Sequence, residues 1–107
     1  MITDKRAEKA LKYLIDTDLE HARIKSEFKA KEAIIKTILA YEFMDAKATA
    51  VESKKMEAYA SKSYIDHIDI MQGLEMELQN MYNKRDSERL VIEMWRTYAA
   101  NSRKGNI

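Results

Sequence analysis

The chain has 107 residues, of which 46% are apolar and 35% are charged, and its formal net charge is +1. This balance excludes an intrinsically disordered chain, because disorder needs low hydrophobicity and a high net charge. The absence of cysteine excludes disulfides, cysteine nucleophiles and cysteine-based zinc sites. The absence of proline, with only Gly73 and Gly105 as glycines, leaves the chain free to form very long helices. The composition therefore predicts an all-α protein.

The N-terminal segment predicts a short helix over about residues 4–15, capped by Thr3 or Asp4. Thr17 is followed three residues later by Glu20, which is the spacing of a capping box. In such a box the Thr17 hydroxyl accepts a hydrogen bond from the Glu20 amide. We therefore expect a second helix to begin directly after Thr17.

The second helix is expected to run over about residues 18–50, because no glycine or proline interrupts this stretch. Its apolar residues recur at steps of four, seven and three, which places them on one face of a helix. The residues that define this face are Ile24, Phe28, Ile35 and Ile38.

The stretch from residue 46 to residue 62 has a thin apolar stripe, and we expect a turn region at 51–62. A short helix over residues 51–59 fits within it, although a continuous helix through 46–63 stays open as an alternative. Ser61 or Ser63 can cap the helix that follows.

The last long helix is expected over about residues 64–101, followed by a basic tail at 102–107. A polar run from Asn83 to Arg89 interrupts its apolar stripe, and this run is either a break or a stretch that leaves its partner. We favour continuous helix because the run contains no glycine or proline. Gly105, after two basic residues, is a typical stop signal. The stripe consists of Ile68, Met71, Leu74, Leu78, Met81, Tyr82, Ile92 and Trp95.

These elements predict a single helical domain over residues 1–107, built as a long antiparallel hairpin with the short N-terminal helix packed against it. A two-helix hairpin covers only one stripe of each helix, so apolar surface would stay exposed. Self-association is the usual answer, and we expect a homodimer that completes a helical bundle. No strict heptad persists for three or four repeats, which disfavours a parallel coiled coil.

The sequence offers little catalytic or metal-binding chemistry. Asp18 and His21 are three residues apart, but a di-metal bundle needs this pattern with glutamate on two helices. There is no glycine-rich phosphate loop and no nucleophile–base constellation. We therefore expect no enzyme, no metal and no cofactor. Because no apolar run approaches the ~18 residues of a membrane span and no signal peptide is seen, we expect a cytoplasmic protein without membrane contact.

The C-terminal part of the chain is basic, since residues 84–107 hold six Lys or Arg and three Asp or Glu. Arginines beside aromatic residues can bind phosphates and stack on bases. The same spacing equally describes one flank of a contact between helices, so a protein interface and a nucleic-acid contact both stay open. The candidate contact residues are Arg85, Arg89, Trp95, Arg96, Asn101, Arg103, Lys104 and Asn106.

The final residues, 93–107, contain Trp-Arg at 95–96, Ala-Asn at 100–101 and Arg-x-Gly-Asn at 103–106. This ending resembles that of small helical proteins encoded by tailed phages and prophages, many of unknown function. The resemblance implies a phage origin in a bacterial host cell, near replication or recombination genes. A docking element anchored by Trp95 and a structural cap with Trp95 in a dimer core are both compatible with it.

The sequence leaves three functional hypotheses. The first is a non-enzymatic phage-type protein that acts by self-association and contact with a phage or host protein, accessory to DNA recombination or replication. The second is single-stranded nucleic-acid binding by the basic C-terminal end. The third is a phage-encoded inhibitor of a host defence system.

Overall fold

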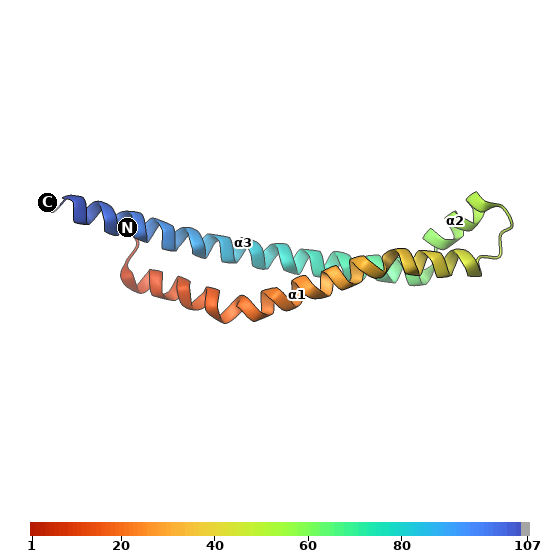
Figure 1. The fold of residues 1–107 in the computed structure, drawn as a ribbon, viewed down its shortest axis with the longest axis horizontal. Coiled ribbons are helices and arrows are strands. Elements are labelled where there is room, and N and C mark those ends of the chain that lie inside the picture. Colours follow the sequence, from red (N-terminus) through yellow and green to blue (C-terminus); the bar gives the residue numbers. More distant parts are fainter. Residues whose placement is uncertain (106–107) are drawn as a thin grey trace. The chain divides into compact units, whose positions relative to one another are not determined.

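The computed structural model describes residues 1–105 of the chain. This part contains three helices and no strand (Figure 1). The prediction of an all-α protein is therefore confirmed. The helices are α1 (Asp4–Asp45), α2 (Val51–Tyr59) and α3 (Lys62–Gly105).

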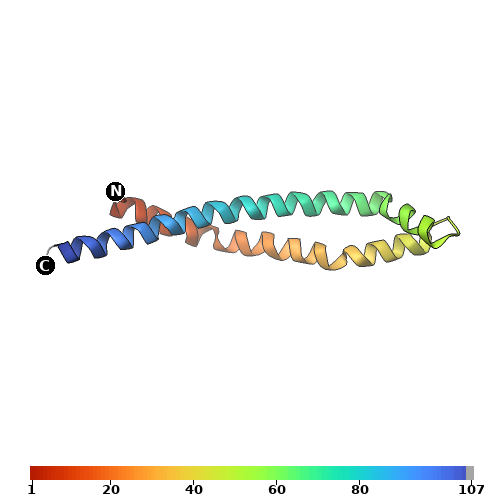
Figure 2. The same cartoon turned by 90° about the horizontal axis from the view of Figure 1, so that it is seen from above.

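Contacts within the chain group its residues into two compact units. Unit 1 combines Met1–Arg23 with Leu78–Ile107, and unit 2 is Ile24–Glu77. Each unit thus pairs one segment of α1 with one segment of α3, and in unit 2 these two segments lie side by side in both views (Figures 1 and 2). The single domain over residues 1–107 stays a prediction.

Helix α1 is continuous through the place where the sequence predicted a break. It starts as expected, since the Thr3 hydroxyl accepts a hydrogen bond from the Arg6 amide at 3.1 Å. The separate helices over residues 4–15 and 18–50 were wrong, however, because Thr17 does not cap a helix. Its hydroxyl donates to the carbonyl of Tyr13, one turn earlier, at 2.8 Å. A threonine whose hydroxyl is hydrogen bonded in this way fits inside a helix, so helix α1 continues through the capping-box sequence.

The region after α1 resolves the choice that the sequence left open. Helix α1 ends at Asp45 rather than near residue 50, and residues 46–50 are not helical. The amide of Lys47 donates to Glu57 Oε2 at 2.7 Å, which ties this turn to α2. The short helix over residues 51–59 is confirmed, and the continuous helix through 46–63 is wrong.

Helix α3 begins at Lys62, two residues earlier than expected, and Ser61 is its cap. The Ser61 hydroxyl accepts from the Tyr64 amide at 3.3 Å and donates to the carbonyl of Ala58 at 2.7 Å. The helix runs without a break through residues 83–89, as favoured, and continues to Gly105. Residues 102–105 are thus helical rather than a separate tail, and 106–107 lie outside the described residues.

The residues that both long helices bury follow a regular spacing. In α3, one series of buried or half-buried positions recurs at alternating steps of three and four residues. The same steps recur in α1 from Ala7 to Glu42, through Thr17, His21 and Lys31. Polar residues interrupt the apolar character of both series, which is why the sequence showed no sustained heptad. The α3 series is Tyr64, His67, Met71, Leu74, Leu78, Met81, Arg85, Glu88, Ile92, Trp95 and Ala99.

Candidate functional site

Arg85 is the central polar contact of unit 1. Its Nη1 donates to the carbonyl of Leu14 at 2.9 Å and to the hydroxyl of Thr17 at 2.6 Å, and its Nη2 lies 3.3 Å from Asp18 Oδ1. The whole residue is only 7% exposed. Arg85 therefore joins α3 to α1 within one chain, and its guanidinium is withdrawn from the partner or nucleic-acid contact that the sequence suggested.

A second ionic contact joins the same two segments one turn of α3 away. Arg6 donates to Glu88 through two parallel hydrogen bonds, from Nη1 to Oε2 at 2.8 Å and from Nη2 to Oε1 at 2.9 Å. Such a forked pair is stronger than a single ionic contact. The hydrogen bond from Arg6 lowers the pKa of Glu88, against a smaller opposing effect of burial. The same bond raises the pKa of Arg6.

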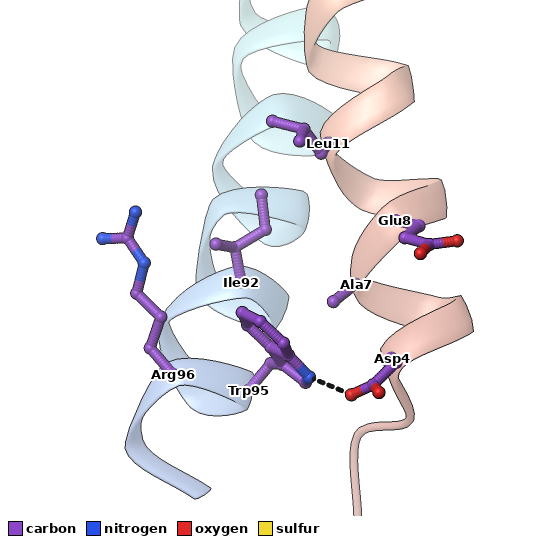
Figure 3. A pocket seen from close by; sticks show the side chains of 7 residues that line it. All are labelled: Asp4, Ala7, Glu8, Leu11, Ile92, Trp95 and Arg96. Carbon is purple, nitrogen blue, oxygen red and sulfur yellow. Dashed lines mark hydrogen bonds between the residues drawn. The ribbon is translucent and has the colours of Figure 1, made fainter. Parts of the chain in front are cut away.

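Trp95 packs against the start of α1 in its own chain. It is half-buried, and its indole Nε1 donates to Asp4 Oδ1 at 2.7 Å (Figure 3). The ring reaches from α3 toward α1 beside Ala7 and Ile92 (Figure 3). A tryptophan half-covered in this way retains apolar surface for a further contact.

Trp95 lines a groove between α1 and α3 with a cavity volume of about 320 Å³. We call it the α1–α3 groove. Acidic Glu8 flanks it on α1 and basic Arg96 flanks it on α3, and the two side chains point away from each other (Figure 3). Its lining residues are Asp4, Ala7, Glu8, Leu11, Ile92, Trp95 and Arg96.

The remaining predicted contact residues do not converge on one site. Arg103 is exposed, and its Nε lies 3.5 Å from the carbonyl of Ala99 in its own helix. Asn106 lies outside the described residues. Of the predicted set, the structure brings only Trp95 and Arg96 together in the α1–α3 groove. Exposed on α3 are Arg89, Arg96, Asn101 and Lys104.

Both helices of unit 1 carry a row of exposed apolar side chains at steps of four residues, a spacing that places them on one side of a helix. On α1 the row starts at the groove with Leu11, which is 53% exposed, and continues through Ile15 to Leu19, which is 82% exposed. On α3 the row lies outside the groove and consists of Leu90, Met94 and Tyr98.

Sequence reasoning allowed for Arg85 on one flank of a contact between helices but missed the other polar residues of the contact face, although a signal for Arg85 and Glu88 was present. Seven residues after Leu78 and Met81, both on the predicted stripe, the chain reaches Arg85 and Glu88. Steps of seven keep a residue on nearly the same side of a helix. Their partners on α1 had no such signal, because only the contact itself identifies them. Those partners are Arg6 for Glu88, and Thr17 and Asp18 for Arg85.

The histidines do not form a metal site with neighbouring carboxylates. His67, in unit 2, is 6% exposed, and its Nε2 lies 2.6 Å from the carbonyl oxygen of Lys31. A carbonyl can only accept, so Nε2 carries the proton and donates. Asp18, which the sequence placed beside His21, contacts Arg85 instead. Within residues 1–105 there is no group of three or more side chains suited to hold a metal ion.

Over the same range, none of the helices combines the length and the apolar character that crossing a membrane requires. No family model matches the chain, and no match is found among curated proteins or solved structures.

Proposed function

We propose that this chain is a non-enzymatic helical interaction protein that acts by self-association and by contact with another protein. The observation that carries the proposal is the imbalance between buried and exposed apolar surface. In residues 1–105 the buried apolar side chains are those of Ala7, Ala10, Ile24 and Ala58, and three of these are alanines. Large apolar residues such as Leu19, by contrast, are exposed. Contiguous exposed apolar surface of this kind marks interaction sites.

We further propose that α1 and α3 form an antiparallel hairpin, completed as a bundle by a second copy. The contacts of unit 1 support the antiparallel direction, since Trp95 contacts Asp4 whereas Arg85 contacts Leu14. The alternating steps of three and four residues along both helices support coiled-coil-like packing. Bundles of this kind bury the stripes that a two-helix pair leaves open.

The partner is proposed on the resemblance of residues 93–107 to phage-encoded proteins. It is a protein of the same phage or of its bacterial host, in the cytoplasm, with DNA recombination or replication as the process served. Affinity capture with the intact chain, followed by mass spectrometry, tests this part of the proposal. Recovery of membrane transporters or ribosomal background alone would contradict it.

Sedimentation equilibrium tests self-association directly. The chain has a mass of 12.5 kDa, and we expect a species of twice that mass whose share grows with concentration. Weak complexes have Kd values of about 1 μM or above. A chain that stays monomeric at every concentration up to about 100 μM would therefore contradict the proposal.

Single-stranded nucleic-acid binding stays a second candidate because of two arginines. Arg89 and Arg96 are exposed, and no salt bridge occupies either within residues 1–105. Binding of a labelled oligonucleotide should then weaken steeply between about 50 and about 200 mM salt, because neutralised phosphates release counterions. Absence of binding at the lower concentration would eliminate this candidate.

A further inference from the structure

We propose that the α1–α3 groove of unit 1 is the face onto which a second copy of this chain docks, with α1 of each copy lying over α3 of the other. This inference rests on the proposed self-association and names the surface and the arrangement that produce it. The face has an apolar part, which favours association, and an ionic part, which identifies the occupant.

The apolar part is the groove and its continuation. The groove is lined by half-buried Ile92 and Trp95, and Leu11 leads from it to Ile15, which is 67% exposed. The α1 segment of unit 1, residues 4–23, is about 30 Å long at 1.5 Å per residue. Two helices about 10 Å wide over that length offer about 600 Å² per copy, near the lower limit for a specific interface.

The ionic part is a difference in charge between the two edges of the groove. The α1 edge carries Asp4 and Glu8, and the α3 edge carries Arg96. Arg89 precedes Arg96 by seven residues and lies on the same side of α3. Glu8, Arg89 and Arg96 are exposed, and the salt bridges of residues 1–105 involve other side chains. Their charges are therefore available to a second molecule.

A second copy matches these edges in only one of the two face-to-face arrangements with two-fold symmetry. A two-fold axis perpendicular to the helices places α1 over α1, so the acidic edges meet. A two-fold axis parallel to the helices places α1 over α3, so each acidic edge meets an arginine edge. Unlike charges across an interface select the partner and the alignment, whereas like charges oppose association.

The heights of the residues along the helices fit the second arrangement. Asp4 is hydrogen bonded to Trp95, and the carbonyl of Leu14, ten residues further along α1, is hydrogen bonded to Arg85, ten residues earlier in α3, so both contacts give the same antiparallel alignment. Glu8 is therefore at a height between Arg89 and Arg96. With a parallel two-fold axis this height is kept, so Glu8 of one copy reaches between the two arginines of the other.

A double charge reversal, Arg89→Glu with Arg96→Glu, tests the proposal. The matched control is Lys84→Glu with Lys104→Glu, which makes the same charge change on α3 at exposed positions outside the groove. We expect the test variant to raise the dimer Kd at least about tenfold in sedimentation velocity, and the control to change it by less than about threefold. Far-ultraviolet circular dichroism checks that both variants stay helical.

Mixing the test variant with Glu8→Arg provides the rescue. Each variant alone brings charges of the same sign together, whereas the mixture restores unlike charges at the two edges. We expect a mixed dimer that is tighter than either variant alone. Failure of the mixture to associate more tightly than its components would overturn the arrangement.

The outcomes separate this inference from the proposed function. If the wild-type chain dimerises and the double reversal has no more effect than its control, the groove is not the interface, while self-association stands. If the wild-type chain is monomeric at every concentration, both the inference and the proposed self-association are overturned.

Discussion

At the scale of single residues, the most informative feature of the chain is the polar character of its helix contacts. Arg85 is buried and bonded to three groups of α1, yet its Nε is buried with no hydrogen-bond partner among the described residues. Removing an arginine from water is costly, and an incompletely satisfied one recovers only part of that cost. We infer that Arg85 aligns α3 with α1 more than it stabilises the pair.

Replacing Arg85 tests this inference. Arg85→Met keeps an unbranched side chain without the guanidinium and leaves no buried group without a partner, because Thr17 still donates to Tyr13 and Asp18 is 78% exposed in its side chain. We expect a change in the free energy of unfolding of less than about 1 kcal/mol, or a gain.

Removing the other partner of this ion pair provides the comparison. Asp18→Ala leaves the buried Arg85 guanidinium without its ionic partner and should cost about 1–2 kcal/mol. Urea unfolding of both variants measures the difference. A loss of more than about 3 kcal/mol for Arg85→Met would show that the arginine contributes stability itself.

The pKa of Glu88 predicts a second effect at this scale. Because the hydrogen bond from Arg6 lowers that pKa from its ordinary value of 4.5, the contact stabilises the folded chain above pH 4.5. This contribution is lost as the pH falls through the lowered pKa of the folded state. Glu88→Gln should therefore lower stability at neutral pH and should make stability fall less as the pH drops below 4.5. The control, Glu93→Gln at an exposed position, should change neither the stability at neutral pH nor its fall at acid pH. Thermal unfolding at a series of pH values distinguishes them.

At the scale of elements, the long helices are continuous because nothing local ends them and long-range contacts hold the ambiguous positions. The capping-box sequence at Thr17 predicted an interruption, and the polar run at 83–89 left one open although continuous helix was favoured. Each lies within a helix because the two meet across unit 1, where the Thr17 hydroxyl accepts from Arg85. A contact between distant segments thus overrides two local signals at once.

Gly73 offers a test of helix continuity in α3. It lies inside the helix, without a positive φ, and a Cβ added there would meet nothing within 4 Å. Gly73→Ala should therefore stabilise the chain by about 0.5–1 kcal/mol, because alanine loses less backbone entropy in a helix. Gly105→Ala, at the last residue of α3, should change the melting temperature little. A destabilised Gly73→Ala would mean that residue 73 needs close approach by another molecule.

At the scale of the whole molecule, the proposed self-association predicts that stability depends on protein concentration, because few apolar side chains of the described residues are buried within one copy. When folding is coupled to dimerisation, the melting temperature rises with protein concentration. We expect this rise for the wild-type chain, and a smaller one for the Arg89→Glu, Arg96→Glu double variant. Differential scanning calorimetry over a wide concentration range measures it. A melting temperature independent of concentration would indicate that each copy is stable alone.

The sequence by itself determined the helical class, the bounds of α2 and the start of α3 within two residues. These features are local, since they depend on the absence of proline, on serine capping and on apolar spacing within one segment. Only the tertiary structure decided which polar residues are buried and that Thr17 and Trp95 contact the other long helix. Apolar periodicity sorts residues by hydrophobicity, whereas Arg85 and His67 are buried, and Glu88 is half-buried, because a specific partner atom faces each of them.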